Sequence, residues 1–277
     1  MNNEELIKLT DVAKKFGKTV ILKDVNFSIY KGQSIALVGN NGVGKSTLLK
    51  MISGLSSVTA GNIAYTSDLL FHYVPEHFAR SKLSVTQYLE LMIRIDDIAP
   101  DVRHGRIESL LKDFFMEHMA DTPLDYLSKG SLQKVGVIQA LLTPPDILLL
   151  DEPLSGQDAN SQRVFIAKMK DLLATGVTII MSCHEKYLVN EISDTVIEIK
   201  NGQIELMKHE KYEISERYVL VFIDEKGELV LPEFDFPMDR IDKRVKMYVD
   251  WDRTDEVISM MMNNGWSLRS MYHEKNN

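Results

Sequence analysis

One stretch of eight residues limits what this chain can fold into more than any other part of the sequence. Residues 39–46, Gly-Asn-Asn-Gly-Val-Gly-Lys-Ser, fit the pattern G-x-x-x-x-G-K-[ST]. They follow a continuous apolar run, Ser34–Val38, which is typical of a strand covered on both faces. A helix is predicted from Lys45 to about Ser53. A strand, a glycine-rich turn and a helix in this order predict a phosphate-binding loop.

The glycines allow consecutive backbone N–H groups to turn inward around phosphate oxygens, and the helix N-terminus adds the positive end of its dipole. We expect Lys45 to reach the β- and γ-phosphates and Ser46 to ligate Mg²⁺. The alternative is a glycine-rich turn without a ligand. The predicted nucleotide-binding residues of this segment are Gly39, Asn40, Asn41, Gly42, Val43, Gly44, Lys45, Ser46 and Thr47.

A second buried strand, Ile147–Leu150, ends in Asp151-Glu152-Pro153. Its acidic end belongs near the phosphates if both strands lie in one sheet. Asp151 would then hold Mg²⁺ directly or through water, and Glu152 would polarise the water that attacks the γ-phosphate. The alternative is a strand that ends in a solvated acidic turn, a reading that the phosphate loop makes less favourable.

The order of the predicted elements indicates an α/β fold. A strand at 147–150, a helix at 164–173 and a strand at 177–181 predict a parallel sheet with right-handed crossovers. Alternating segments between Leu6 and Ile29 predict a short antiparallel β unit of three strands. Helical apolar spacing from Val85 to about Asp125 predicts an inserted helical subdomain.

Composition excludes several classes of protein. The 277 residues are 44% hydrophobic and 26% charged, an ordinary globular mixture. Because the net charge is -8, nucleic acid is not an expected partner. The single cysteine, Cys183, suits a reducing compartment. The N-terminus lacks signal-peptide features, and no apolar run approaches the ~20 residues of a membrane helix. We expect a cytoplasmic protein whose membrane contact is indirect.

With its phosphate-binding loop and its acidic strand end, the chain resembles the nucleotide-binding ATPases of ABC transporters over about residues 4–205. Residues 127–133, Leu-Ser-Lys-Gly-Ser-Leu-Gln, are similar to the family's signature loop, commonly written LSGGQ. The resemblance implies that Ser128 and Gly130 contact the γ-phosphate of ATP bound to a second subunit. Lys129 and Ser131 depart from the commonest form, and Lys129 could add a phosphate contact. Taken alone, the segment predicts only a serine-capped helix start.

The resemblance also implies roles for residues that follow the acidic strand end at Asp151 and Glu152. His184 is similar to the family's switch histidine, which contacts the γ-phosphate and orients the attacking water, although a histidine at a strand end can be merely structural. Residues 155–158, Ser-Gly-Gln-Asp, resemble the D-loop at the dimer interface, with Gln157 where leucine is usual. Asp158 is the residue that matches.

Two further residues are carried over from the family. Phe16 stands where an aromatic side chain stacks on adenine, and core packing is the alternative reading. Glu76, in Tyr73-Val74-Pro75-Glu76, stands where glutamine usually links Mg²⁺ to the subdomain that contacts the transporter. A carboxylate can still ligate a metal or a water.

The resemblance implies a P-loop NTPase of ABC type. It would have an N-terminal antiparallel β unit, a parallel core sheet and a helical signature subdomain at about 85–140, all within an ATPase domain of residues 1–202. The residue composition changes after Gly202, which predicts a small α+β accessory domain, 203–277. In it we expect strands at 218–224, 228–231, 245–250 and 266–272, with a helix after Thr254.

The expected function is ATP hydrolysis, with ATP and Mg²⁺ as cofactors, that powers transport through separately encoded membrane subunits. Two copies would clamp two ATP molecules at the inner face of the cell membrane. The short ATPase unit with its small tail favours export over import. One alternative is a soluble ABC ATPase that acts on a cytoplasmic assembly such as a ribosome or an iron–sulfur scaffold. Another is a partner-binding protein that holds ATP as a structural ligand.

Overall fold

The computed structural model describes residues 4–95, 100–154, 157–207, 217–224, 229, 231–232, 234, 236–250 and 253–273. The chain divides into two compact units, Met1–Glu210 and Lys211–Asn277. This boundary falls later than the predicted one after Gly202. The reason is that β9 (Gln203–Met207) pairs antiparallel with β8 (Thr195–Lys200) and so belongs to the first unit.

The first unit begins with a three-stranded antiparallel sheet. Its strand order is β2-β1-β4, with β1 at Glu5–Phe16, β2 at Thr19–Tyr30 and β4 at Ala60–Tyr65. The expectation of three short strands before residue 30 is therefore wrong. β1 and β2 are each 12 residues long, because bulges let the pairing continue past polar positions such as Asp11 and Asp24. The third strand comes from after the phosphate loop.

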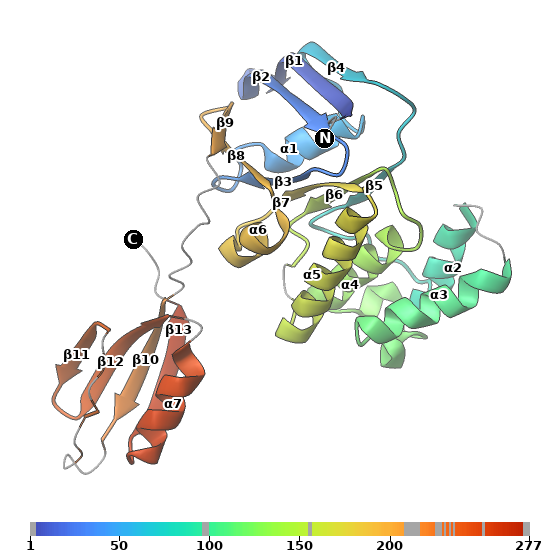
Figure 1. Ribbon diagram of the computed structural model, residues 1–277. Coiled ribbons are helices and arrows are strands. Elements are labelled where there is room, and N and C mark those ends of the chain that lie inside the picture. The colour runs from blue at the N-terminus through green and yellow to red at the C-terminus, as the bar shows by residue number, and fades with distance from the viewer. Residues whose placement is uncertain are drawn as a thin grey trace. The chain divides into compact units, whose positions relative to one another are not determined.

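A six-stranded sheet forms the centre of the first unit (Figure 1). Its first five strands are parallel and β9 is antiparallel. The buried strands of this sheet read as continuous apolar runs, as a parallel sheet covered on both faces requires. The order is β5 (Phe71–Val74), β6 (Ile147–Asp151), β7 (Thr178–Ser182), β3 (Ser34–Val38), β8 and β9.

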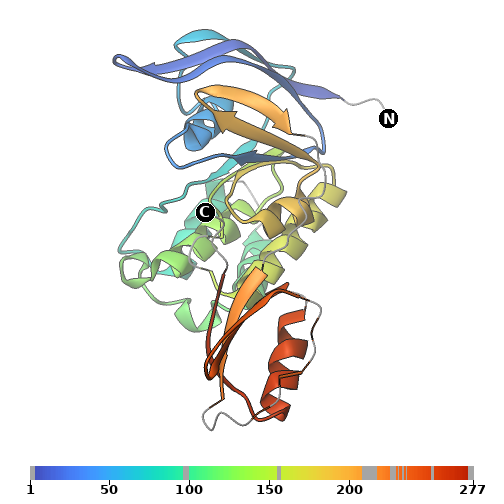
Figure 2. The same cartoon turned by 90° about the vertical axis from the view of Figure 1, so that its left-hand side faces the viewer.

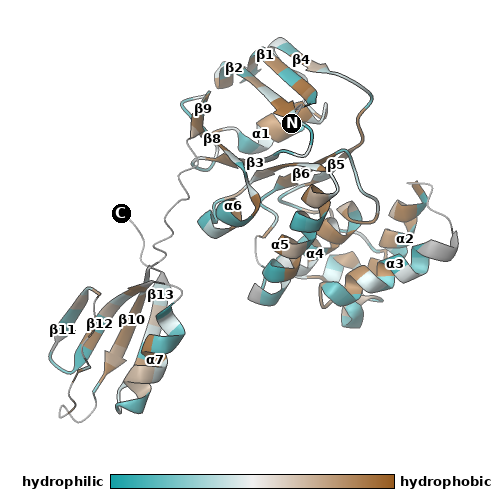
Figure 3. Cartoon of the chain, viewed as in Figure 1, coloured by the Kyte–Doolittle hydropathy of each residue, from teal (hydrophilic) through white to brown (hydrophobic). Residues whose placement is uncertain are grey.

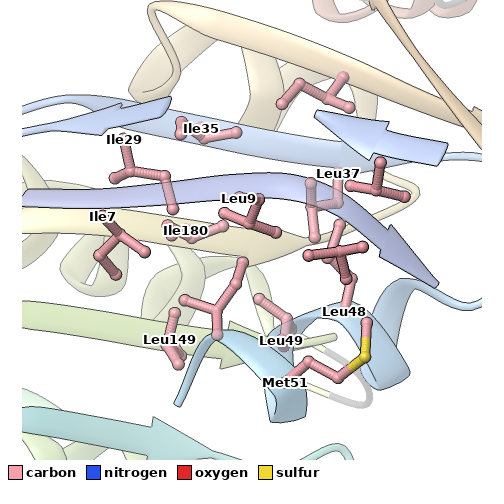
Figure 4. Packing of buried hydrophobic residues seen from close by; sticks show 14 of the residues in the cluster. Ile7, Leu9, Ile29, Ile35, Leu37, Leu48, Leu49, Met51, Leu149 and Ile180 are labelled. Carbon is pink, nitrogen blue, oxygen red and sulfur yellow. The ribbon is translucent and has the colours of Figure 1, made fainter. Parts of the chain in front are cut away.

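Helix α1 (Lys45–Ile52) lies between the two sheets, where its apolar face fills the core. Leu48, Leu49 and Met51 of α1 meet Ile7 and Leu9 of β1, and strand residues of the central sheet complete the cluster (Figure 4). Because α1 is fixed on both sides, the loop that precedes it is held at the carboxyl end of β3. The α/β fold predicted from the sequence is confirmed.

The other α-helices of the first unit lie in two stretches, one at or just after the predicted helical segment and one after the acidic strand end. The structure has α2 at Val85–Ile95, α3 at Pro100–Asp113, α4 at Lys129–Ala140, α5 at Ala159–Ala174 and α6 at Lys186–Ile192. In α2 the buried residues Val85, Leu89 and Ile93 recur every fourth position, which gives the helix one apolar face.

The second unit is a four-stranded antiparallel sheet with α7 against one face (Figures 1 and 2). Apolar residues run along β10 (Figure 3), and Phe222, Met247 and Trp266 are buried against Met261 of the helix. The order is β11-β12-β10-β13, with β10 at Arg217–Ile223, β11 at Met238–Ile241, β12 at Arg244–Asp250, α7 at Thr254–Asn263 and β13 at Ser267–His273.

One predicted strand of the second unit is wrong. Leu229 and Leu231 lie in no strand, and residues 228 and 230 fall outside the described part of the chain. β11 pairs with the edge of β12 that faces away from β10, and a tight turn with Asp242 at φ +52° joins β11 and β12 into a hairpin. The Leu229 N–H instead donates to the Asp224 carboxylate at 2.7 Å.

Candidate functional site

The predicted phosphate loop lies where β3 ends and α1 begins. Gly39 has a φ of +135° and Gly44 a φ of +113°, which are backbone conformations that favour glycine. A Cβ atom on Gly39 would lie 2.6 Å from the carbonyl oxygen of Ile199, so a larger residue does not fit there. Gly44 is the N-cap of α1, and the loop therefore leads directly into the unpaired N–H groups of the first helical turn.

The side chain of Lys45 folds back over this loop. Its Nζ donates to the carbonyl oxygens of Gly39 at 2.8 Å and Asn40 at 3.3 Å. The same atom lies 3.2 Å from Nε2 of His184 and 3.9 Å from Oε1 of Glu152. Only 6% of the side chain is exposed. An anion that entered here would offer this nearly buried cation stronger, charge-assisted hydrogen bonds.

Three hydroxyl groups hold the buried carboxylate of Asp151. Ser46 Oγ donates to Oδ1 at 2.9 Å, Ser182 Oγ donates to Oδ1 at 2.6 Å, and the Tyr73 hydroxyl donates to Oδ2 at 3.1 Å. Burial, together with the Asp151 charge, raises the pKa of Tyr73, so this hydroxyl keeps its proton. Asp151 is thus fixed from β5, β7 and α1 at once.

Sequence reasoning did not assign a role to Ser182 or Tyr73. Ser182 carried a signal, because it is a polar residue at the end of an otherwise apolar strand, two positions before His184. Tyr73 carried none, since its contact with Asp151 depends on the pairing of β5 with β6. Tertiary structure alone brings these groups together.

Glu152 follows in a strained backbone conformation, with a φ of +51°. Its N–H donates to the carbonyl oxygen of Ser182 at 3.1 Å, which fixes the turn. Its Oε1 lies 3.0 Å from Nε2 of His184, and Nε2 is also 2.8 Å from Oδ1 of Asn41. These two oxygen atoms can accept a hydrogen from Nε2, whereas the Lys45 ammonium, 3.2 Å from the same nitrogen, can only donate to it.

The surroundings of these two residues shift the pKa of each. Burial raises the pKa of Glu152 to about 7, against the opposing effect of the Lys45 ammonium. Burial and the Lys45 charge lower the pKa of His184. The neighbouring carboxylates that push the pKa of Glu152 further up are Glu185, Asp151 and Glu76.

A cavity of about 560 Å³ opens onto these groups. Nine of the sequence-predicted residues line it, and Ile21 of β2 lines it as well. Ile21 was missed because an apolar residue in a strand gives no sign of facing a polar cavity. The predicted residues on the lining are Asn41, Gly42, Gly44, Lys45, Ser46, Thr47, Glu76, Glu152 and His184.

The remaining loop residues support the cavity from behind. The carbonyl groups of Gly39 and Asn40 bind Lys45, as described above. Val43 packs against the hydrophobic core with its side chain, and its N–H donates to the Asn40 carbonyl oxygen at 3.4 Å.

Ser128 and Gly130 lie at the start of α4, away from the cavity lining. Ser128 is the N-cap of this 12-residue helix, and its Oγ accepts a hydrogen bond from the Ser131 N–H at 3.1 Å. Gly130 is buried in the first turn. The structure therefore has the serine-capped helix start that the isolated segment predicts.

Asp158 is the N-cap of α5, where its Oδ1 accepts from the Ser161 N–H at 3.0 Å. Its Oδ2 lies 2.8 Å from Nζ of Lys134 on α4, and this hydrogen bond holds the pKa of Asp158 well below its usual range. The neighbouring Ser155 and Gly156 lie outside the described residues. Asp158 therefore ties α4 to α5.

Phe16 ends β1 and is 57% exposed, so the alternative of core packing is wrong. Lys14 Nζ lies 5.0 Å from the centre of its ring. Phe16 does not line the cavity of the described residues.

The fold and this site define a P-loop nucleotide-binding protein, and comparison with known proteins narrows the class. The family model described as ABC transporter matches residues 22–155. The zinc import ATP-binding protein ZnuC of Halorhodospira halophila is 32% identical over 206 residues, which are 73% of this chain and 76% of that protein. The uncharacterized ABC transporter ATP-binding protein YthP of Bacillus subtilis is 35% identical, over 66% of this chain and 78% of that one.

A solved structure agrees with these relatives. The dimeric structure of an ATP-binding cassette in a post-hydrolysis state, bound to ADP and Pi, matches with a TM-score of 0.65 at 26% identity, covering 73% of this chain and 99% of that one. The chain belongs to the family of ABC transporter ATP-binding proteins, and it is an ABC ATPase. In the part of the chain that the structure describes, every helix is too short or too polar to cross a membrane.

Proposed function

We propose that this chain hydrolyses ATP at the described cavity and so drives transport through membrane subunits encoded as separate chains. The observation that carries the proposal is that Lys45, Asp151 and Glu152 meet beside one cavity. Lys45 supplies a cation for phosphate, Asp151 a carboxylate for the metal and Glu152 a carboxylate for the attacking water. The direct test is phosphate release from ATP by the purified protein, compared with the Lys45→Ala variant. Equal rates would remove this cavity from the reaction.

The nucleotide would be held at both ends. The loop amides and Lys45, which leaves its two carbonyl partners, bind the β- and γ-phosphates. Phe16, exposed at the end of β1, offers a ring face for adenine. A Phe16→Ala variant with unchanged ATP affinity would exclude this stacking.

The residues at the phosphate end fit Mg²⁺. Ser46 and Asp151 present oxygen atoms already 2.9 Å apart, and Glu76 adds a carboxylate from the cavity lining. Mg²⁺ prefers oxygen ligands and takes one or two protein groups together with substrate phosphates and water. When bound, it would neutralise charge that develops on the phosphate oxygens.

Glu152 and His184 would then act on the attacking water. The Glu152 carboxylate accepts a hydrogen bond from that water and takes its proton as the new oxygen–phosphorus bond forms. The bond between the γ-phosphorus and the bridging oxygen breaks, which leaves ADP and phosphate. His184, 3.0 Å from Glu152, orients the carboxylate and is within reach of a γ-phosphate oxygen.

The active form would be a pair of chains, homodimeric where one gene supplies both. The start of α4, with Ser128 and Gly130, would meet the γ-phosphate bound to the other copy, and Asp158 would lie near the interface. The relative bound to ADP and Pi is itself described as dimeric. ATP-dependent sedimentation of the hydrolysis-deficient Glu152→Gln protein as a dimer is the expected result.

The membrane partner would contact the helical segment between Tyr73 and Asp125. Leu91 and Ile95 are large apolar residues exposed on α2 there, which suits a helix-in-groove contact. In native membranes the chain should sediment with the bilayer, at its cytoplasmic face, and leave it together with a polytopic protein in mild detergent. Recovery only with ribosomes or an iron–sulfur scaffold would favour the alternative function instead.

Export is the direction that the sequence favours, on the basis of the small C-terminal unit. Import is the second candidate, because several relatives are zinc import ATP-binding proteins, among them those of Halorhodospira halophila, Rickettsia conorii and Yersinia enterocolitica. Transport assays in inside-out and right-side-out membrane vesicles, with ATP supplied on the side of this subunit, separate the two directions.

A further inference from the structure

Helix α4 lies along the segment that follows β5, and residues one turn apart make the contacts. Gln133 Nε2 donates to the Pro75 carbonyl oxygen at 3.1 Å. One turn further on, a Cβ atom on Gly136 would lie only 2.8 Å from the ring of Phe78, which shows how closely the helix approaches. Because positions i, i+3 and i+4 share a face of a helix, these contacts define one continuous seam.

Lys129 is the charged end of this seam. It stands four positions before Gln133, on the same face of α4, and its Nζ lies 3.7 Å from Oε1 of Glu76. Nδ1 of His77 is 3.5 Å from the same oxygen. Both members of the Lys129–Glu76 pair are about half-exposed, at 53% and 43%.

Glu76 also lines the nucleotide cavity, where its charge is unfavourable for a polyanion. Glu152 lines the same cavity, so two carboxylates face the space that phosphates would occupy, whereas Lys45 supplies the one ammonium among the described lining residues. A like charge near a phosphate weakens its binding unless a cation neutralises it. Lys129 is the cation that contacts Glu76.

We propose that Lys129 is a positioning residue that neutralises and orients the Glu76 carboxylate at the cavity of its own subunit. This inference rests on the proposed ATP binding at the cavity. The competing reading is that Lys129 acts on a phosphate of the nucleotide bound to the second copy, without need of Glu76.

A double-mutant cycle on the full-length protein distinguishes the two readings. The measured quantity is the dissociation constant for Mg²⁺-bound, methylanthraniloyl-labelled ATP, read from its fluorescence. Lys129→Gln should raise this constant about two- to five-fold, the range for a half-exposed ion pair. In a Glu76→Gln background the same change should have no effect, and Lys129→Arg should bind as the wild type does.

The matched control is Lys31→Gln, which breaks another exposed ion pair, with Glu4 at 3.5 Å, on residues that do not line the cavity. It should leave the constant unchanged. An equal loss from Lys129→Gln in both backgrounds, or no loss in either, overturns the proposal. A wild-type protein that does not bind the labelled ATP would instead refute the proposed function.

Thermal melting of each variant confirms that it is folded. If Lys129→Gln does not fold, a double variant that exchanges the two charges, Glu76→Lys with Lys129→Glu, takes its place. This double variant is expected to bind the labelled ATP nearly as the wild type does.

Discussion

The hydroxyl of Ser46 donates a 2.9 Å hydrogen bond to the carboxylate of Asp151, although 105 positions separate the two residues in the sequence. The contact joins the first turn of α1 to the carboxyl end of β6. It exists because β3 and β6 are parallel strands separated only by β7, so that both end at the same edge of the sheet. The proposed metal ligands, Ser46 and Asp151, therefore lie together beside the glycine-rich loop.

Glu152→Gln is predicted to lower ATP turnover about 10²- to 10⁴-fold while ATP still binds. The amide keeps the size of the side chain but cannot take a proton from water. Lys45→Ala should instead weaken binding itself, because the cation at the loop is lost. Turnover and equilibrium binding of the two variants, measured side by side, check this difference. Near-normal turnover in Glu152→Gln would remove that residue from its role.

Tyr73→Phe is predicted to raise the Mg²⁺ concentration that gives half-maximal ATPase activity about five-fold, the effect of one hydrogen bond of ~1 kcal/mol. The change removes one of three hydroxyls that hold Asp151. Tyr65→Phe is the matched control, since the Tyr65 hydroxyl donates to the Ile52 carbonyl oxygen and not to Asp151. Equal Mg²⁺ dependence of the two variants would contradict a role for Tyr73.

ATPase activity at limiting ATP should rise with pH and level off above an inflection near the pKa of Glu152, about 7. The deprotonated carboxylate is the active form, and its fraction falls as pH falls through that pKa. Glu185→Gln removes a charge that raises the pKa of Glu152, so the inflection should move to lower pH. If Glu185→Gln leaves the profile unchanged, the inflection belongs to another group.

A chain that ends after residue 210 is predicted to fold and to bind ATP, because the whole cavity lies in the first unit. A chain that ends after Gly202 should unfold at a lower temperature, because it loses β9 and the contact of Ile204 with the core. Thermal melting and ATP titration of both truncations check this. A folded 1–210 protein without ATP binding would show that residues beyond 210 contribute to the site.

The 1–210 protein also tests what the second unit does. We expect this unit to take no part in the chemistry and to tune dimerisation or partner contact. Removal of the unit should then change the ATP-dependent fraction of dimer in sedimentation while turnover per bound ATP stays the same. A change in turnover with an unchanged dimer fraction would reverse this assignment.

The parts of the site that the sequence predicts are those set by local structure. The glycine loop and the acidic strand end each place their own groups, so Lys45, Ser46 and Asp151 could be found from spacing and from the apolar strands before them. Tyr73 could not be found, because it reaches the site through the pairing of β5 with β6, which joins distant segments. Ile21 could not be found, because only the packing of β2 against the loop at Gly44 brings this apolar side chain to the cavity. β11 was missed because it is only four residues long and half polar, so that it forms a strand only as the hairpin partner of β12.

Because Gly136 has no side chain, helix α4 can pack closely, and a substitution there would move residues that Gly136 itself does not contact. Any larger residue would push the Phe78 ring, which lies edge-on to Tyr88, and would lift α4 from the segment after β5. Lys129 in the first turn of the helix lies 3.7 Å from Glu76 because the helix packs so closely. A substitution at Gly136, which does not line the cavity, would therefore lower ATP turnover while the rest of the fold changes little. A mutational screen confined to the residues that line the cavity would not find the cause.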